Sequence, residues 1–282
     1  TVVEAPPSEH KQTYGEDYSG AFSGEVRVPQ DDDDQTLLTE RKVIARRAAM
    51  ELVPDAVVNL GVGVPETIPV VASEGNISDE ITQTVEAGPI GGSPSGGISF
   101  GTAVNHEALV TSPEQFDFYD GGGLDIGYLG MAQIDADGNI NVSRFGSQLP
   151  GCGGFINITQ NAEKVVFCGT LTTGGLDVDV GDGTLDIVSE GDGTKFVDEV
   201  EQITFSGDYA VETDQPIVYV TERAVFELSG DGLVLTEVAP GVDAETDVVD
   251  NMAFDPVVAD DLAEMNPALF REEPMDLSEY VN

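Results

Sequence analysis

The residues best suited to chemistry surround Glu86, in the segment TVEAGPIGGSPSGGISFG (84–101). Six of the fifteen residues that follow Glu86 are glycine, more than one turn requires, so we expect another group to approach this backbone closely. A carboxylate that attacks an acyl carbon must be lightly hydrated, and backbone N–H groups must stabilise the oxyanion that forms. Small residues around Glu86, and the glycines of the GCGG segment (Gly151, Gly153 and Gly154), meet these needs. The pattern favours Glu86 as a covalent nucleophile in acyl transfer.

Other catalytic residue types are less well supported by their number and spacing. The chain has two histidines, His10 and His106, and no GxSxG motif, so serine or cysteine catalysis would have few possible general bases. His106 follows Asn105 at an expected helix start, where an exposed or capping role is usual. Cys152 and Cys168 lie 16 residues apart without a CxxC motif, which fits neither zinc nor a disulfide framework. We therefore expect free thiols and no metal site.

Two further turns raise the question of a bound nucleotide or metal. GVGVPE (61–66) lies between an expected strand and an expected helix, but it lacks the third glycine of a dinucleotide fingerprint. Such a turn suits a phosphate or a carboxylate at the start of the helix. DADGN (135–139) lacks the spacing of an EF-hand loop and predicts a hairpin turn. We expect the substrate pocket to be lined by backbone at Gly61, Gly63, Gly91 and Gly92.

The elements that must position these residues alternate between helix and strand in the first half of the chain. We expect, in order, a helix that begins after the N-cap Thr39, a strand over 57–60, a helix over 65–75, a strand leading to Glu86 and a short helix over 105–110. From residue 123 the pattern is mostly β, with hairpin turns at 181–183 and 230–232. A short helix and a tail follow from residue 247. The sum is one α/β domain with an open mixed sheet and a β-rich C-terminal part.

The N-terminal segment and the first helix differ in composition from the rest. Residues 1–38 carry aromatic residues and an aspartate run (31–34) without a sustained period, so we expect an extended arm, or linker, ahead of a domain over 39–282. Four of the eleven basic residues lie in the first helix, and we expect them to pair with the surrounding acids rather than bind phosphate. They are Arg41, Lys42, Arg46 and Arg47.

The chain carries 53 acidic and 11 basic residues, for a formal net charge of −42. This balance excludes nucleic acid as a partner, because phosphate neutralisation needs a basic face. A hydrophobic content of 40% and clear strand patterning argue against an acidic disordered chain. Self-repulsion of this size opposes compaction in dilute buffer, whereas about molar salt shortens the Debye length to about 3 Å. We interpret the charge as that of a cytoplasmic protein from a salt-accumulating halophile.

The sequence also bears on membrane insertion and processing. It contains no run of about 18 apolar residues, which argues against a membrane partner. The N-terminus lacks the basic and apolar regions of a signal peptide. It also lacks an initiator methionine, so we expect a processed product, a fragment or half of a longer chain.

Several long segments resemble one known enzyme family. TVEAGPIGG (84–92) is similar to the catalytic-glutamate motif of the family I CoA-transferases, above all the single-chain acetate, propionate and acetoacetate CoA-transferases. Val85 and Ala87 depart from the Ser-Glu-Asn-Gly form of the wider family. The likeness covers the chain from residue 14 to about residue 270. It extends through VNLGVGVPE (58–66), FDFYDGGGLD (116–125), FGSQLPGCGGFINITQNAEKVVFCGT (145–170), QITFSG (202–207) and VTERAVF (220–226).

The resemblance implies two α/β halves with the active site between them, this chain being the second, β-type half. It implies an α-type first half as partner, in a homo- or hetero-oligomer, with a second oxyanion donor from that half. Glu86 would be the nucleophile, and Gly153 and Gly154, with Gly151, would serve the oxyanion and coenzyme A. The reaction would be ping-pong transfer of coenzyme A between short-chain acyl-CoA and small carboxylates, with no metal or redox cofactor.

Two alternatives stay open from the sequence. An acyl-CoA hydrolase could use the same glutamate, with water in place of the acceptor carboxylate. A non-catalytic acidic binding module would not use this glutamate as a nucleophile.

Overall fold

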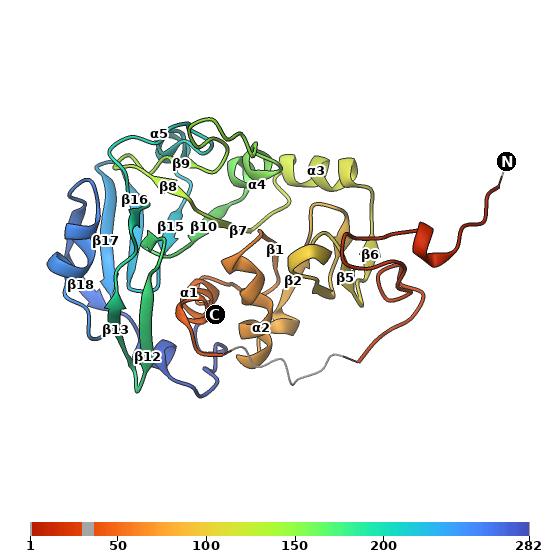
Figure 1. The fold of residues 1–282 in the computed structure, drawn as a ribbon, viewed down its shortest axis with the longest axis horizontal. Coiled ribbons are helices and arrows are strands. Elements are labelled where there is room, and N and C mark those ends of the chain that lie inside the picture. The colour runs from red at the N-terminus through yellow and green to blue at the C-terminus, as the bar shows by residue number, and fades with distance from the viewer. Residues whose placement is uncertain (1, 30–36, 282) are drawn as a thin grey trace.

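The computed structural model describes residues 2–29 and 37–281, so the aspartate run at 31–34 lies outside the described residues. A ten-stranded mixed sheet forms the centre of the molecule, in the order β18-β17-β16-β15-β10-β7-β1-β2-β3-β6 (Figure 1). Its strands are β1 (Ala56–Leu60), β2 (Ile81–Thr84), β3 (Pro89–Ile90), β6 (Ala108–Leu109), β7 (Ile126–Gly130), β10 (Lys164–Cys168), β15 (Ile217–Val220), β16 (Ala224–Ser229), β17 (Gly232–Val238) and β18 (Val257–Glu264).

The middle five strands, from β15 through β10, β7 and β1 to β2, are parallel, so their carboxyl ends meet at one edge of the sheet. β16 and β17 continue the sheet as an antiparallel hairpin, and β3 and β6 are antiparallel on the other side. The described residues also form four small two-stranded pairs. They are β4 (Ser93–Pro94) with β5 (Ala103–Val104), β8 (Gln133–Ile134) with β9 (Ile140–Asn141), β11 (Thr172–Thr173) with β14 (Gly193–Thr194), and β12 (Asp177–Gly181) with β13 (Thr184–Ser189).

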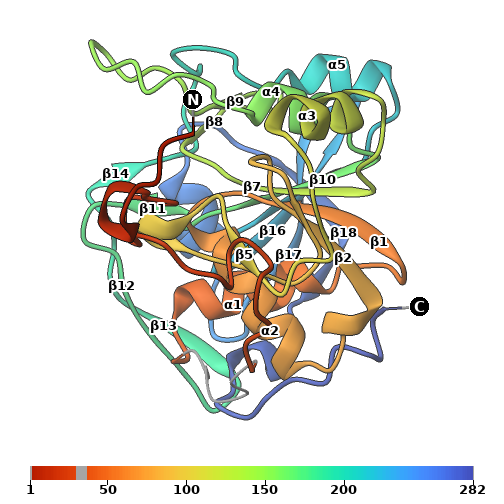
Figure 2. The ribbon, with the colours of Figure 1, turned by 90° about the vertical axis from the view of Figure 1, so that its right-hand side faces the viewer.

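Helices cover both faces of the sheet, as Figure 2 shows, with α3, α4 and α5 on one side and α1 and α2 on the other. Their bounds are α1 (Glu40–Ala49), α2 (Ile68–Glu74), α3 (Ser112–Asp120), α4 (Phe155–Asn161) and α5 (Gly207–Glu212). Alternate residues of the central strands feed two separate hydrophobic cores. In β10, Val166 packs in the core under α1 and α2, while Val165 and Phe167 pack under α3 and α4. Burial on both faces explains why these strands read as continuous apolar runs.

Short turns of 3₁₀ or π helix connect these elements. They are η1 (Pro7–Glu9), η2 (Val64–Thr67), η3 (Ser78–Glu80), η4 (Gly97–Ser99), η5 (Ala244–Val248), η6 (Val249–Asn251) and η7 (Pro267–Phe270). The expected α/β fold with an open mixed sheet is thereby confirmed, as are the hairpin turns at 181–183 and 230–232. The expected helix over 65–75 forms as η2 followed by α2.

The prediction of a short helix over 105–110 is wrong. Asn105 has a φ of +58°, which a helix cannot contain, and it separates β5 from β6. The helix begins instead at Ser112, after a capping box between Thr111 and Glu114. His106 is correspondingly buried rather than exposed, with Nδ1 3.1 Å from the Ala103 carbonyl oxygen. The tail expected after residue 247 also contains a strand, β18, which pairs with β17.

The basic residues of α1 pair with acids inside the molecule. Lys42 Nζ lies 2.9 Å from Glu74, and Arg47 binds both Glu51 and Glu237 at 2.5 to 2.9 Å. Arg46, only 1% exposed, donates to backbone carbonyl groups near the C-terminal end, those of Ala268, Leu269, Arg271 and Glu273. Arg41 is the exception and is exposed. Pairing with acids is confirmed for Lys42, Arg46 and Arg47.

The N-terminal arm packs on the segment that follows Glu86. Thr13 Oγ1 lies 3.2 Å from Ser99 Oγ, and Arg27 Nη1 donates to the Asn105 carbonyl oxygen at 2.5 Å. Within the described ranges, none of the helices is both long and apolar enough to span a bilayer.

Candidate active site

Glu86 lies at the tip of a tight turn between β2 and β3. The Gly88 N–H donates to the Val85 carbonyl oxygen at 2.9 Å, and the Val85 N–H donates to the Pro89 carbonyl oxygen at 3.1 Å. Gly88 has a φ of +126°, and a Cβ there would lie 2.0 Å from the Val110 carbonyl oxygen. Only glycine fits at this position, so the turn holds Glu86 at the carboxyl edge of the parallel strands.

A neutral amide orients the Glu86 carboxylate. Asn59 Nδ2, on β1, lies 3.2 Å from Glu86 Oε2 and 3.2 Å from the Tyr119 hydroxyl oxygen. The Tyr119 hydroxyl donates to Thr84 Oγ1 at 2.9 Å. Asn59 and Tyr119 are fully buried, whereas Glu86 is partly exposed. The carboxylate is therefore fixed from the protein side and open on the other.

The Glu86 carboxylate has no cationic partner among the described residues, since no lysine or arginine forms an ion pair with it. Burial raises the pKa of Tyr119, and the nearby charge of Glu86 adds to this effect, so the tyrosine remains a neutral hydroxyl. An anion without a cationic partner keeps its charge available for attack on a carbon atom.

The GCGG loop precedes α4 on the same face of the sheet as Tyr119. Gly151 and Gly153 have φ values of +84° and +51°, and both are exposed. Gly154 is the N-cap of α4, and a Cβ there would lie 2.8 Å from the Phe116 ring on α3. In the described part of the chain, the N–H groups of Gly153 and Gly154 have no hydrogen-bond acceptor. Neither N–H group donates to Glu86 in this part of the chain.

The four glycines expected to line the substrate pocket fall in different places. Gly63 lines a cavity of about 440 Å³ at the carboxyl ends of β1, β7 and β10. Gly91 and Gly92 line a second cavity of about 930 Å³, beside α2 and the arm. Gly61 lines neither of these two; its N–H donates to the Tyr128 carbonyl oxygen at 2.7 Å within the sheet. These two cavities therefore separate Gly63 from Gly91 and Gly92.

Sequence reasoning missed Asn59 and Tyr119 as partners of Glu86. The signal for Asn59 was present, because a lone amide in the buried strand AVVNL must find a partner. Tyr119 sits at the end of α3, a helix that was not expected there. Over the described residues, no three histidine, cysteine, aspartate or glutamate side chains converge as a metal site. Both cysteines are free, and burial raises the pKa of the Cys168 thiol far above its usual range.

The sequence of the chain is similar to those of several known proteins. The chain is 48% identical over 267 residues to caffeate CoA-transferase of Acetobacterium woodii, which covers 93% of this chain and 51% of that protein. It is 43% identical over 274 residues to acetate CoA-transferase YdiF of Escherichia coli K12, covering 97% and 52%. The chain thus spans about half the length of these relatives. It is also 29% identical to the acetate CoA-transferase subunit beta of Haemophilus influenzae, over 81% of this chain and 96% of that subunit.

Solved structures give the same result. An acyl-CoA transferase (YdiF) from E. coli O157:H7, in a thioester complex with CoA, superposes with a TM-score of 0.81 at 46% identity, over 86% of this chain and 46% of that one. Glutaconate coenzyme A-transferase from Acidaminococcus fermentans shares the fold at 19% identity, with a TM-score of 0.64 over 88% of this chain and 99% of that one. A scan against protein-family models finds no match. The sequence identities and the shared fold together show that the chain belongs to the family I CoA-transferases, as their β-type half.

Proposed function

We propose that this chain carries the nucleophile of an enzyme that moves coenzyme A between a short-chain acyl-CoA and a carboxylate acceptor of the acetate, propionate or 3-oxoacid class. The observation that carries the proposal is the Glu86 carboxylate, held 3.2 Å from a buried neutral amide and without an ion pair among the described residues. The relatives' names support the reaction class, since they are caffeate and acetate CoA-transferases.

The reaction proceeds through two covalent states of Glu86. A carboxylate oxygen attacks the thioester carbonyl carbon, which forms a mixed anhydride and releases the coenzyme A thiolate. The thiolate then attacks the glutamyl carbonyl carbon, giving a glutamyl-CoA thioester and the free carboxylate product. An acceptor carboxylate reverses both steps and leaves with coenzyme A. The thioester energy is conserved throughout, so Glu86 needs no metal or redox group for these steps.

The GCGG loop supplies backbone donors for the oxyanions in this proposal. The N–H groups of Gly153 and Gly154 have no acceptor among the described residues, which suits donors that wait for substrate. Because neither N–H group donates to Glu86, both can receive the oxyanion of an acyl group that Glu86 attacks. Gly151, at φ +84°, shapes the turn that presents the two donors.

The proposal includes an α-type half as partner. Among exposed apolar residues, Val62 is 60% exposed between Gly61 and Gly63, and Leu149 is 74% exposed beside the GCGG loop. Apolar residues at this edge are what an interface would cover. We expect the chain alone to be slow or inactive and prone to self-association, and addition of the α-type polypeptide to restore transfer. Equal turnover by the chain alone and by the pair would contradict the partnership.

We further propose that the enzyme works in the cytoplasm of a halophile. The support is the distribution of charge: only five of the eleven basic residues are exposed, against a total of 53 acids. The exposed ones are Lys11, Arg27, Arg41, Arg144 and Arg271.

The decisive experiment is mass spectrometry of the complete enzyme after incubation with an acyl-CoA and no acceptor. We expect a coenzyme A adduct on the peptide that contains Glu86, and no adduct in Glu86→Gln, because an amide cannot form the anhydride. Glu86→Asp should retain little activity, since the carboxylate retracts by about one C–C bond from the attacking position. Near-normal turnover in Glu86→Ala would contradict the assignment.

Hydrolysis of acyl-CoA through the same glutamate is the rival reaction, and the same sample separates the two. Transfer to added acetate at a rate well above that of acyl-CoA hydrolysis selects the transferase. Hydrolysis at the same rate with and without acetate selects the hydrolase. An absence of any adduct would favour a binding module.

A further inference from the structure

Two side-chain amides and a hydroxyl form a buried polar cluster behind Glu86. Gln115 and Tyr119 lie one turn apart on α3, so they share the face of the helix that packs on the sheet, and both are fully buried. Asn59 reaches the cluster from β1 and is also fully buried. Asn59 contacts Glu86, whereas Gln115 forms no hydrogen bond with it in the described part of the chain. Any effect of Gln115 on the carboxylate must therefore act through the other two side chains.

The hydrogen bonds of this cluster run in one direction and end on the backbone. Asn59 Nδ2 donates to the Tyr119 hydroxyl oxygen at 3.2 Å, and this hydroxyl donates to Thr84 Oγ1 at 2.9 Å. Thr84 Oγ1 donates in turn to the Val58 carbonyl oxygen at 2.8 Å. Asn59 Nδ2 also lies 3.2 Å from Glu86 Oε2 and 3.4 Å from the Thr84 carbonyl oxygen. Its two hydrogens are thus shared among three acceptors, so another contact must keep one of them on Glu86.

Three polar atoms of the cluster have no partner. Within the described ranges, Asn59 Oδ1, Gln115 Nε2 and Gln115 Oε1 are buried without a hydrogen bond. Burial raises the pKa of Tyr119, and the Thr84 hydroxyl and the Gln115 and Asn59 amides oppose this shift, so the Gln115 amide lies beside the Tyr119 hydroxyl. An acceptor without a donor and a donor without an acceptor therefore lie around one hydroxyl. Burial of such groups destabilises the protein, and an apolar side chain at position 115 would avoid part of that loss.

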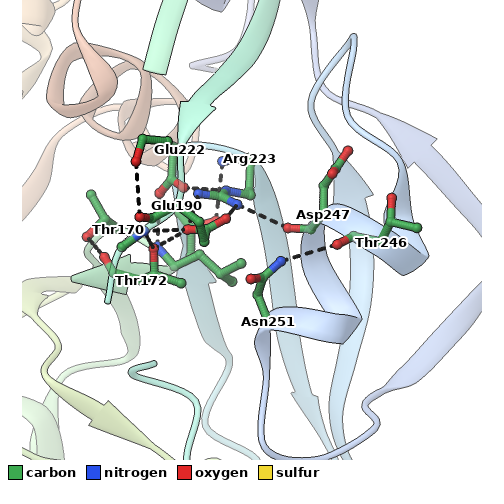
Figure 3. A network of polar contacts seen from close by, with 12 residues as sticks. Thr170, Thr172, Glu190, Glu222, Arg223, Thr246, Asp247 and Asn251 are labelled. Carbon is green, nitrogen blue, oxygen red and sulfur yellow. Dashed lines mark hydrogen bonds and ion pairs between the residues drawn. The ribbon is translucent and has the colours of Figure 1, made fainter. Parts of the chain in front are cut away.

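A second buried polar network, centred on Arg223, has its hydrogen bonds complete (Figure 3). Glu222 and Arg223 are fully buried, and Arg223 Nε donates to Glu222 Oε1 at 2.5 Å. Glu222 Oε2 accepts from the Leu171 N–H at 2.9 Å, and Arg223 Nη1 donates to Glu190 Oε2 at 2.6 Å. Incomplete hydrogen bonding is therefore not general to the buried polar groups of this chain, and its occurrence beside Glu86 needs an explanation.

The charge of Glu86 changes during the proposed reaction, and the cluster must keep its arrangement while it does. The free carboxylate is an anion and attracts an N–H of Asn59 strongly, whereas the anhydride and the thioester are neutral and attract it less. The Tyr119 hydroxyl and the Thr84 carbonyl group then compete for the same two hydrogens. Because a side-chain amide is planar, a hydrogen bond to Asn59 Oδ1 would stop the whole group from turning away.

We propose that Gln115 is a positioning residue of the transfer reaction. In the complete enzyme, Gln115 Nε2 donates to Asn59 Oδ1, and this bond keeps one N–H of Asn59 directed at the Glu86 side chain in its charged and its covalent states. The bond requires a change in side-chain torsion, because the two atoms are not hydrogen-bonded in this structure. The inference rests on the proposed function and deepens it, because it concerns the same glutamate.

Gln115→Met tests the proposal, because it removes the amide and keeps an unbranched side chain of similar size. With the chain and its α-type partner together at one fixed KCl concentration, we expect kcat to fall by about tenfold, the loss of one hydrogen bond, and the KM of acyl-CoA to stay unchanged. A raised KM with normal kcat would place Gln115 in substrate binding and overturn the proposal. Gln215→Met is the matched control. It removes a half-buried amide bound to the Thr159 and Ala162 carbonyl groups, so it should lower the melting temperature and leave kcat unchanged.

A double-mutant cycle in kcat shows whether Gln115 acts through Asn59. Asn59→Ala alone should lower kcat by about a hundredfold. The double variant Gln115→Met, Asn59→Ala should lose no more than that, because Gln115 has no other route to Glu86. A loss of about a thousandfold in the double variant would mean that the two effects are independent, and it would overturn the proposal.

A crystal structure of the complete wild-type enzyme separates failure of this inference from failure of the proposed function. We expect Gln115 Nε2 within about 3.2 Å of Asn59 Oδ1. Other partners for both atoms, in an enzyme that transfers coenzyme A, would leave the function standing and reject the role of Gln115. The bond in an enzyme that transfers no coenzyme A would confirm the contact and reject the function.

Discussion

Asn59 lies on β1 beside the turn that carries Glu86 after β2, and 3.2 Å separates the amide nitrogen from the carboxylate oxygen. The amide positions the carboxylate without adding positive charge, so the acid is held but not neutralised. The Asn59 amide nitrogen also lies 3.2 Å from the Tyr119 hydroxyl oxygen, and this hydroxyl stays protonated because burial raises the pKa of Tyr119.

We expect Asn59→Ala to lower kcat by about a hundredfold, the loss typical of a displacement of about 1 Å, with little change in the KM of acyl-CoA. Asn59→Asp should lose more, because a second carboxylate beside Glu86 disfavours ionisation of the pair and raises its apparent pKa. Steady-state kinetics over a pH series measures both, with thermal melts as the control for folding. A folded Asn59→Ala enzyme with normal kcat would show that the amide has no part in positioning.

Salt should stabilise the chain and promote its activity. The exterior holds most of 53 acidic residues and only five exposed basic ones, so dilute buffer leaves their repulsion unscreened. The melting temperature and the transfer rate should both rise between about 0.1 M and about 2 M KCl, because the Debye length falls from about 10 Å to below 3 Å. An unchanged melting temperature over this range would refute the halophilic interpretation.

The Glu222–Arg223 pair should show strong coupling in a double-mutant cycle. Arg223→Met should lower the free energy of unfolding by about 3–5 kcal/mol, because Glu222 would remain buried without its partner. Adding Glu222→Leu should recover part of that loss, so the two effects would not be additive. Chemical denaturation of the four proteins at high salt measures the cycle. Additive losses would mean that the two charges do not act as a pair.

The ion pairs of Glu51 should make the free energy of unfolding fall more steeply at acidic pH. Burial alone would raise the pKa of Glu51, but Arg47 and Lys164 outweigh burial and the pKa is lowered. A carboxyl with a lowered folded-state pKa contributes stability above its unfolded value, near pH 4.3, and loses it as the pH falls through the folded value. Unfolding measured from about pH 6 to about pH 3 should therefore depend less on pH in Glu51→Gln. Glu212→Gln, at an exposed position on α5, is the matched control; identical acid limbs in the two variants would contradict the prediction.

Periodic patterns and turn residues predicted most of the sheet, because β1, β7 and β10 are buried on both faces and read as apolar runs. The turn at Glu86 was also predictable, because a cluster of glycines in a sequence indicates a turn with positive φ values. The helix expected over 105–110 does not form, because a left-handed asparagine leaves no periodic pattern in the sequence. The capping box from Thr111 to Glu114 marks the true start of the helix.

What the sequence could not supply is the proximity of residues from distant segments. Asn59 meets Glu86 only because β1 and β2 are paired in parallel with Asn59 opposite Thr84. Lys195, which follows β14, and Arg41, at the start of α1, line one cavity although they are far apart in the sequence, and β14 is placed there by its pairing with β11. The sequence does not distinguish the glycines at positions 61, 63, 91 and 92. In the structure, Gly63 lines one cavity, Gly91 and Gly92 line another, and Gly61 is hydrogen-bonded to the neighbouring strand.

The hydrogen bonds from Arg46 to the carbonyl groups of residues 268–273 determine when α1 can dock during synthesis of the chain. Arg46 and Leu269 are 223 positions apart, so the ribosome adds the second about 11–45 s after the first, at about 5–20 residues per second. During that interval α1 lacks the carbonyl partners of Arg46 and the apolar cover that Leu269, Phe270 and Leu277 provide. Native docking of the first helix must therefore await synthesis of residues 268–277, so the contacts that anchor α1 are among the latest that these residues can form.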